Sequence, residues 1–251
     1  MAAHYDNYDY PSYWNNRDYE HESEVLALNH FLKQIKKKGT MVELGSGFGR
    51  LAPIYFDRFK KVVLTEPSIK LLTIAQHNLT DKRISFIKST LQTLSTKIKK
   101  NTADVVLMVR VAHHITDMNK ALKSINTLLV PKGYLILEFA NKRHIKAIVT
   151  EFFKGNLTFA LDIFPKDISS AKSKRNHSLP FINYHPDIIE EMLKENGFKI
   201  VDQVSVSNIR IPVVKRYVPV SILIKLEGFI QKHFSNHRCG PSIFILAQKK
   251  G

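Results

Sequence analysis

Residues 41–51 decide the fold, and they read Met-Val-Glu-Leu-Gly-Ser-Gly-Phe-Gly-Arg-Leu. A short apolar run with one carboxylate, Glu43, leads into glycines at three alternate positions, and an apolar segment typical of a helix start follows. Glycine has no Cβ and accepts positive φ, so such a turn lets the backbone approach a bulky polar ligand. A helix N-terminus adds free N–H groups and a positive dipole end. We therefore expect a strand, a ligand-binding turn and a helix that ends near residue 58.

The spacing of the three glycines narrows the kind of ligand. A dinucleotide-binding fingerprint, G-x-G-x-x-G, would need its third glycine at position 50, which is Arg50. A phosphate-binding P-loop would need Gly-Lys-Ser/Thr, which is also absent. The remaining pattern, E-x-G-x-G-x-G, resembles the first motif of class I S-adenosylmethionine-dependent methyltransferases. That resemblance implies S-adenosylmethionine as the cofactor.

Length and composition suit a single globular domain, and the resemblance implies one methyltransferase domain over residues 1–251. Hydrophobic residues make up 44% of the chain and charged residues 24%, which is ordinary for such a domain. No run of about 18 apolar residues predicts a transmembrane helix, and the first residues do not resemble a secretory signal. A single cysteine, Cys239, leaves no internal disulfide and no cysteine cluster for a metal. We expect a cytoplasmic protein without a bound metal.

The formal net charge of +16 is the unusual property of the composition. It is compatible with a polyanionic partner such as RNA, or with peripheral contact to an acidic membrane surface. It is equally compatible with lysines that decorate the whole surface. The basic residues are scattered in short groups, which favours general decoration over a nucleic-acid site; these groups are residues 36–38, 60–61, 97–100 and 172–175.

Strand and helix patterns alternate along the first 140 residues. After the expected helix at 22–36, β-branched or apolar runs predict strands, and amphipathic spacing or a proline start predicts helices between them. A Pro-Lys-Gly turn at 131–133 precedes the fifth strand. A further helix at 185–196 is followed by two more strands. The expected strands are 41–44, 61–65, 84–87, 103–109, 134–139, 198–206 and 240–248, with helices at 69–78 and 118–129.

This alternation indicates a doubly wound α/β fold. The resemblance implies a mostly parallel, seven-stranded, Rossmann-like methyltransferase sheet with an antiparallel last strand. Three segments fall outside it: an aromatic arm at 1–21, expected to contain neither helix nor strand, and insertions at 141–184 and 207–238. We interpret the insertions as a helical cap over the substrate. The arm is either a lid over the ligands or a shield for the core.

Apolar residues dominate 218–230 in the second insertion. This stretch is too short to span a bilayer. It can form the wall of an apolar substrate pocket, touch a membrane surface or form a dimer contact. The alternative is a helix packed on the edge of the sheet. The sequence does not indicate an oligomeric state.

The resemblance also assigns cofactor contacts to particular residues. Glu43 would hold the amino group of the cofactor, and the backbone of the glycine turn would lie along it. Glu66, about twenty residues later at a strand end, would accept hydrogen bonds from both ribose hydroxyls, as carboxylates do in dinucleotide folds. Arg50 would pair with the cofactor carboxylate or with the arm. The full predicted set is Tyr19, Glu43, Gly45, Ser46, Gly47, Gly49, Arg50, Glu66, Pro67, Thr90, Leu91, Val109 and Arg110.

Thr90 and Leu91 stand where many family members carry an aspartate near the adenine. This departure means that the individual adenine contacts would differ from the family pattern. We expect Thr90 to use its backbone N–H and hydroxyl, and Leu91 its apolar surface.

The methyl acceptor is expected at the end of the fourth strand, because ligands bind at the carboxyl ends of parallel strands. Residues 108–115 lack the Asn/Asp-Pro-Pro-aromatic signature of many base N-methyltransferases. They resemble the small-molecule group often called type 11 methyltransferases. A hydroxyl acceptor would need a base, and His113 and His114 are the candidates, since histidine titrates near neutrality. Alternatively, these histidines only cap the next helix or pack on the cofactor.

The sequence thus predicts methyl transfer from S-adenosylmethionine to a small-molecule acceptor, and an apolar or lipid-like acceptor would suit residues 218–230. One rival is an RNA or ribosomal methyltransferase that uses the basic surface. The other is a non-catalytic protein that binds S-adenosylmethionine without turnover.

Overall fold

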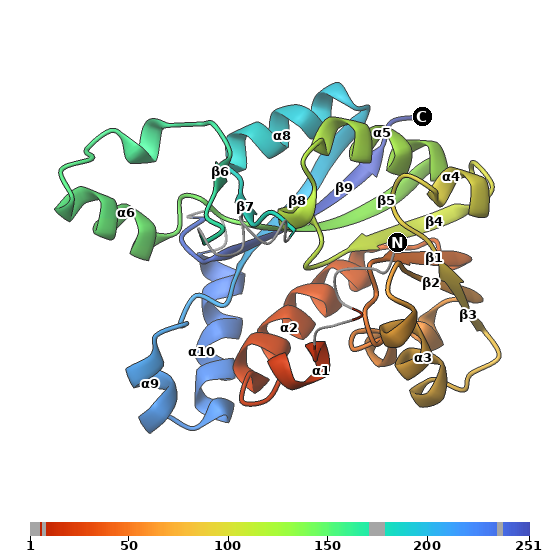
Figure 1. The fold of residues 1–251 in the computed structure, drawn as a ribbon, viewed down its shortest axis with the longest axis horizontal. Coiled ribbons are helices and arrows are strands. Elements are labelled where there is room, and N and C mark those ends of the chain that lie inside the picture. Colours follow the sequence, from red (N-terminus) through yellow and green to blue (C-terminus); the bar gives the residue numbers. More distant parts are fainter. Residues whose placement is uncertain (1–5, 7–8, 171–178, 235–237) are drawn as a thin grey trace.

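A computed structural model describes residues 6, 9–170, 179–234 and 238–251. The expected basic group at 172–175 and the aromatic residues Tyr5 and Tyr8 lie outside the described residues. A seven-stranded sheet runs through the molecule in the order β3-β2-β1-β4-β5-β9-β8 (Figure 1). Its strands are β1 (Thr40–Leu44), β2 (Lys61–Glu66), β3 (Ile84–Lys88), β4 (Ala103–Met108), β5 (Leu129–Ala140), β8 (Phe198–Val206) and β9 (Ser242–Lys249).

All neighbouring strands are parallel except β9, which is antiparallel to both β5 and β8. The predicted doubly wound sheet with one antiparallel last strand is therefore confirmed. The antiparallel strand lies between β5 and β8, so β8 forms one edge of the sheet and β3 the other.

Several helices begin where the sequence supplies a capping side chain. Ser68 accepts the N–H of Leu71 at the start of α3, and Asp117 accepts the N–H of Lys120 at the start of α5. Such side-chain acceptors satisfy N–H groups that have no partner within the helix. The helices are α1 (Tyr10–Tyr13), α2 (Asp18–Gln34), α3 (Ile69–Asn78), α4 (Leu94–Lys97), α5 (Met118–Leu128), α6 (Ile145–Phe153), α8 (Pro186–Glu195), α9 (Pro212–Tyr217) and α10 (Val220–His233).

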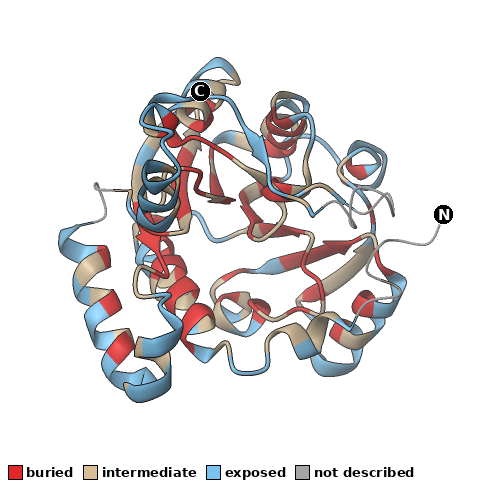
Figure 2. Ribbon diagram, turned by 60° about the vertical axis from the view of Figure 1, so that its left-hand side comes forward, coloured by how far each residue is buried: buried red, intermediate tan, exposed pale blue. Residues whose placement is uncertain are grey.

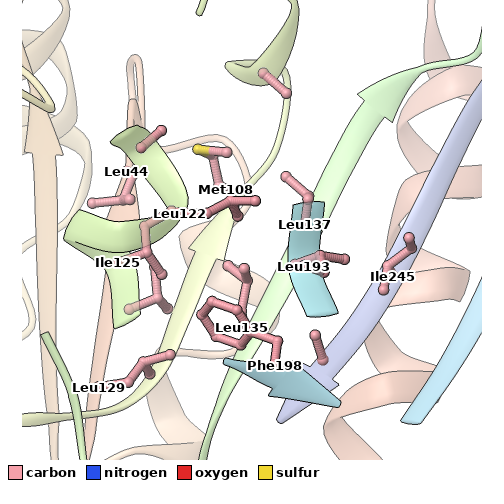
Figure 3. Close-up of a cluster of buried hydrophobic side chains, with 14 of the residues drawn as sticks. Leu44, Met108, Leu122, Ile125, Leu129, Leu135, Leu137, Leu193, Phe198 and Ile245 are labelled. Carbon is pink, nitrogen blue, oxygen red and sulfur yellow. The ribbon is translucent and has the colours of Figure 1, made fainter. Parts of the chain in front are cut away.

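Two hydrophobic clusters cover the two faces of the sheet. Along β4, Val106 and Met108 belong to one cluster and Val105 and Leu107 to the other, as the alternation of a strand requires. The first cluster includes side chains of α5 and α8 (Figure 3), and the second includes the buried face of α2. Because both faces are covered, the central strands carry almost no polar side chains.

Three buried carboxylates on the central strands therefore stand out, and they are Glu43, Glu66 and Glu138.

Two local predictions are wrong. The arm contains helix, because Asp9 caps α1 and α2 begins at Asp18, four residues before the predicted start. The glycine turn is followed by two 3₁₀ segments, Ala52–Ile54 and Phe56–Arg58, instead of an α-helix. Tyr55 separates them with φ −135°, outside the helical range, while its hydroxyl reaches the carboxylate of Glu43.

The expected turn at 131–133 is also placed differently. β5 already pairs with β4 at Leu129, and the register shifts before Tyr134. Lys132 has φ 59°, so the Pro-Lys-Gly sequence forms an irregularity within the strand. Ordinary pairing continues from Tyr134.

The first insertion contains α6, a 3₁₀ turn at Phe159–Leu161 and a small two-stranded sheet, β6 (Lys166–Asp167) with β7 (Ile182–Asn183). The second contains α9 and α10. These helices lie at the periphery and are largely exposed, whereas the central strands are buried (Figure 2). Within the described ranges, none of the helices has the length and hydropathy needed to cross a membrane.

Candidate functional site

The glycine turn follows β1 directly and has a left-handed backbone at Gly45, Gly47 and Gly49, with φ of 65°, 56° and 79°. A Cβ at Gly49 would lie 2.6 Å from Cδ1 of Leu79, so this glycine lets α3 pack against the turn. A Cβ at Gly47 would lie 3.4 Å from the ring of Tyr10. The middle of the turn is therefore covered by the N-terminal arm.

Glu66 lies at the carboxyl end of β2, directly beside the glycine turn. Its Oε2 accepts the N–H of Gly47 at 2.9 Å, and its Oε1 accepts the N–H of Ser68 at 2.9 Å. Burial raises the pKa of Glu66, and these two hydrogen bonds oppose the rise. A carboxylate offers about four acceptor positions, so further donors can bind to the two oxygens. Glu66 is thus a fixed acceptor next to a turn that allows close approach.

Glu43 is buried in β1 and accepts a hydrogen bond from the hydroxyl of Tyr55. Burial raises its pKa to about 7, despite the opposing effects of the Tyr55 hydrogen bond and of Arg50. Near neutral pH this carboxyl therefore changes charge easily. A cationic ligand group beside it would favour the ionised form.

A buried charge chain, Glu138–Arg110–Glu24–Arg50, connects β5 to the glycine turn. Glu24 on α2 is 1% exposed; Arg110 approaches its Oε1 at 2.6 Å and Arg50 binds its Oε2. Burial alone would raise the pKa of Glu24, but the guanidinium groups of Arg110 and Arg50 hold it below its usual value. The carboxylate therefore stays ionised and fixes both arginines.

Arg110 follows β4 with φ 61°, an uncommon conformation for a residue with a side chain. Its backbone N–H donates to Glu138 at 2.8 Å, and Ser242 on β9 donates to the same carboxylate at 2.7 Å. Burial raises the pKa of Glu138, and the charge of Arg110 opposes the rise. Backbone strain persists only where surrounding contacts enforce it, and it is concentrated at functional sites.

The N-terminal arm covers these arginines. Arg50 lies over the ring of Trp14 at 3.5 Å, and Arg110 lies over the same ring at 5.0 Å. The ring of Tyr10 contacts Phe48 edge-on, with the centroids 6.1 Å apart. Of the two partners predicted for Arg50, the structure shows contacts with the arm.

Several other predicted contacts have a defined place. Pro67 is half-buried beside Glu66, Val109 is buried at the end of β4, and Leu91 packs against the first cluster. Thr90 is exposed, and its N–H donates to Oγ1 of Thr93 at 3.0 Å. The N–H expected to contact adenine is therefore engaged in a local turn.

Tyr19 is fully buried and holds α2 against α10. Its hydroxyl donates to Glu227 at 2.6 Å and accepts the N–H of Ile209 at 2.8 Å. Burial and the neighbouring Glu227 raise the pKa of Tyr19. The hydroxyl of Tyr19, a predicted cofactor contact, is therefore engaged in a contact between helices.

His113 and His114 follow Arg110 in a 3₁₀ turn, with ring centroids 4.0 Å apart. His113 is buried and packs on Phe181 of the first insertion, and Nδ1 of His114 lies 2.8 Å from the carbonyl of Pro180. Burial, then His114 and Arg110, lowers the pKa of His113 well below its ordinary value. His113 is therefore neutral at physiological pH.

A cavity of about 970 Å³ opens where the arm and both insertions meet. Its wall combines residues of the 15–20, 144–146 and 208–216 segments with Cys239 and Pro241. We call it the cap pocket. Glu20 in its wall lies one helical turn before Glu24 on α2, and a turn rises only about 5.4 Å. The cap pocket therefore adjoins the buried charge chain.

Residues 218–230, the apolar stretch of the second insertion, form most of α10. The helix packs on α2 through its inner face, where Leu223, Glu227 and Gln231 are buried. Leu226 and Phe229 on the outer face are about half exposed. Of the interpretations of residues 218–230, a packed helix describes the inner face of α10, which lies against α2.

The sequence interpretation missed Glu24 and Glu138. Each had a visible signal: Glu24 occupies the apolar stripe of α2, four residues before Leu28, and Glu138 interrupts the apolar run of β5. An isolated carboxylate at a buried position requires partners.

Comparison with known proteins identifies the family of this site. A family model described as a methyltransferase domain matches residues 42–137, the part that contains the glycine turn, Glu66, Arg110 and the two histidines. The chain is a class I S-adenosylmethionine-dependent methyltransferase.

The methyltransferase is similar in sequence to the ubiquinone/menaquinone biosynthesis C-methyltransferase UbiE of Shewanella frigidimarina. The two are 24% identical over 198 residues, which cover 75% of this chain and 74% of UbiE. UbiE of Escherichia coli O1:K1 / APEC is also 24% identical, over 182 residues, 67% of this chain and 69% of that protein.

Solved structures share the fold of the methyltransferase. A Listeria monocytogenes protein assigned as an S-adenosylmethionine-dependent methyltransferase matches with a TM-score of 0.63 at 16% identity, over 91% of this chain and 99% of that chain. The S-adenosylmethionine-dependent methyltransferase of Mesorhizobium loti gives 0.59 at 12% identity, over 89% and 98%.

Proposed function

We propose that this methyltransferase binds S-adenosylmethionine along the glycine turn and transfers its methyl group to a small molecule in the cap pocket. The observation that carries the proposal is the position of Glu66. Backbone N–H groups of Gly47 and Ser68 hold its carboxylate at the carboxyl end of β2, where parallel α/β sheets bind their ligands.

The residues around the turn fit this cofactor. Oγ of Ser46 is buried and has no hydrogen-bond partner among the described residues, so it is available to a polar ligand. Glu66 would accept the ribose hydroxyls, and Glu43 would attract the ammonium group of the methionine part. The backbone of Gly45 and Gly47 would lie against the cofactor. Pro67, Thr90, Leu91 and Val109 would border the ribose and adenine.

Bound S-adenosylmethionine supplies an electrophilic methyl group on a sulfonium. The protein's contribution is to align donor and acceptor, which can account for much of the rate of such a displacement. Glu138 and Glu24 hold Arg110 at the end of β4, next to where the acceptor would lie. Trp14 and Tyr10 cover the turn and exclude water from it.

A proton leaves the acceptor when a hydroxyl, or a carbon that carries hydrogen, is methylated. His113 and His114 are the proposed bases because both lie in the 3₁₀ turn that follows Arg110. Neutral His113 has an unprotonated ring nitrogen, although its lowered pKa makes it a weak base. The carbonyl of Pro180 would fix the proton of a neutral His114 on Nδ1.

The acceptor we propose is a small molecule with an apolar part. The size of the cap pocket supports this, since small-molecule sites are commonly about 300–1,000 Å³. Ile145, Ile211 and Pro212 supply apolar surface in its wall. The similarity to UbiE proteins, whose name describes carbon methylation in quinone biosynthesis, supports a carbon acceptor.

The test uses S-adenosylmethionine labelled in its methyl group and a cell extract as the source of acceptors. After reaction, the extract is separated into lipid, small-molecule, RNA and protein fractions. We expect the label in the small-molecule or lipid fraction with wild-type protein, and a strongly reduced signal with Glu66→Ala. Label confined to RNA or protein, or no transfer to any fraction while the cofactor binds, would contradict the proposal.

A further inference from the structure

The wall of the cap pocket is strongly cationic. It contains a single carboxylate, Glu20, against five basic side chains: Arg17, Lys146, Arg210, Lys215 and Arg216. They come from the arm, from the first insertion and from the second insertion. Three segments that are distant in sequence therefore bring the same sign of charge to one cavity.

The carboxylate of Glu20 is already paired. Nζ of Lys215 lies 2.7 Å from both of its oxygens, and Nε of Arg210 lies 3.5 Å from Oε1. Glu20 itself is 2% exposed. Lys215 and Arg210 therefore neutralise Glu20, the one negative charge of the wall.

The other three cations have no carboxylate partner among the described residues. Arg17 lies over the ring of Tyr13 at 4.0 Å, and Arg216 lies near the ring of Tyr217 at 5.8 Å. Lys146 is exposed at the start of α6. Cations that line a hollow and lack a counter-charge raise the local concentration of anions.

The same positive surroundings affect the pKa of His144. It caps α6 at the edge of the pocket, and burial lowers its pKa. The positive charges of Lys146 and Arg210 lower the pKa further. A neutral imidazole and uncompensated cations thus face the same cavity.

We propose that the cap pocket is an anion-selective acceptor site, which binds a molecule that carries a carboxylate or a phosphate beside an apolar body. Arg17, Lys146 and Arg216 bind the anionic group, and Ile145 and Ile211 contact the apolar body. As the site of the acceptor, this rests on the proposed function. As a binding site, it is testable without the cofactor.

The probes are three compounds with one ring system: 2-naphthoate, 2-naphthyl phosphate and the neutral 2-naphthamide. Their affinities for the full chain are measured by fluorescence titration at low salt. We expect at least one anion to bind about tenfold or more tightly than the amide, since ionised partners roughly double the strength of a hydrogen bond. The tighter anion distinguishes a carboxylate from a phosphate acceptor.

The test variant is Lys146→Glu combined with Arg216→Glu, two exposed residues without an ion pair among the described residues. The matched control is Lys99→Glu with Lys100→Glu, which makes the same charge change just before the amino end of β4. We expect the test variant to lose the preference for the anion, and the control to keep it within about twofold.

Equal binding of all three probes by wild type would overturn the proposal, as would equal losses in the two double variants, which would show a general surface effect. Calorimetry with S-adenosylhomocysteine on wild type separates the two proposals. Absence of cofactor binding would contradict the proposed function, whereas the anion preference is decided by the naphthalene probes alone.

Discussion

Among the described residues, charged side chains are paired around the glycine turn, which we call the turn side, and partly unpaired around the cap pocket, which we call the cap side. On the turn side, Glu24 is buried and contacts two arginines, and Glu66 is held by two backbone N–H groups. On the cap side, Arg17, Lys146 and Arg216 have no carboxylate partner among the described residues. Fixed, paired charges suit one invariant ligand, because they cost no reorganisation when it binds. Cations without partners suit a ligand that brings the opposite charge itself.

The largest expected effect tests the pairing on the turn side. Glu24→Gln removes the buried carboxylate that Arg50 and Arg110 both contact, and breaking such a pair costs about 3–5 kcal/mol of folding free energy. Urea unfolding of the variant measures the loss. Glu22→Gln, an exposed position on the same helix, is the control and should change stability by less than about 0.5 kcal/mol. Similar unfolding free energies for Glu24→Gln and Glu22→Gln would show that the paired charges of the turn side do not stabilise the fold.

Glu43 gives the turn side a pH dependence. Its native pKa of about 7 exceeds the ordinary value of 4.5, so the native state holds this proton more tightly than the unfolded state. The resulting stabilisation is complete below about pH 4.5 and is lost as the pH rises through 7, by about 3 kcal/mol in total.

Glu43→Gln removes this titration and keeps a side-chain oxygen for Tyr55. The unfolding free energy of wild type relative to the variant should therefore fall between pH 4.5 and 8. A difference that stays constant or rises over this range would show that the native pKa of Glu43 is not raised.

α10 in the second insertion allows a buried and an exposed leucine to be compared within one helix. Leu223 is 1% exposed and Leu226 is 48% exposed. Leu223→Ala should cost about 2–3 kcal/mol, because it leaves a cavity against the packed face. Leu226→Ala should change the unfolding free energy by less than about 0.5 kcal/mol. Comparable losses in denaturant titrations would mean that the outer face of α10 is buried in solution.

Two glycines with nearly equal φ allow the contribution of packing to stability to be measured apart from that of backbone strain. Gly49 on the turn side has φ 79°, and Gly155 in the first insertion has φ 82°. Alanine pays a similar strain, about 1 kcal/mol, at both positions. At Gly49 its Cβ would also press on Leu79, whereas nothing lies within 4 Å at Gly155.

Gly49→Ala should therefore be the more destabilising of the pair by about 1–2 kcal/mol in thermal or urea unfolding. Gly155→Ala is the matched control for strain alone. Equal losses would show that Leu79 moves aside without cost, and that the turn is packed no more tightly than the cap.

The regular part of the fold was predictable because its signals are local. Strands β1 to β4 and helices α3 and α5 have their own apolar period and, in the helices, their own cap, so their bounds fall within one or two residues of the prediction. The segment after the glycine turn was not predictable in this way. Tyr55 leaves the helical conformation to reach Glu43, and this contact depends on tertiary structure.

The candidate site was only partly readable for the same reason. The glycine turn and Glu66 are linked by a motif and its spacing, and the structure joins them through the hydrogen bond from Gly47. Glu24 and Glu138 belong to no motif; the packing of α2 against the sheet brings Glu24 to Arg110, and the pairing of β4 with β5 brings Glu138 there. The cap pocket is harder still, because three separate segments build its wall.

The most direct measurement of the central claim is calorimetric binding of S-adenosylmethionine to wild type and Glu66→Ala. Loss of hydrogen bonds to a charged acceptor should weaken binding by about ten- to a hundredfold. Asp57→Ala, which removes an exposed carboxylate, should bind like wild type. If Glu66→Ala folds and binds S-adenosylmethionine as tightly as wild type, the assignment of the glycine turn and Glu66 as the cofactor site is wrong.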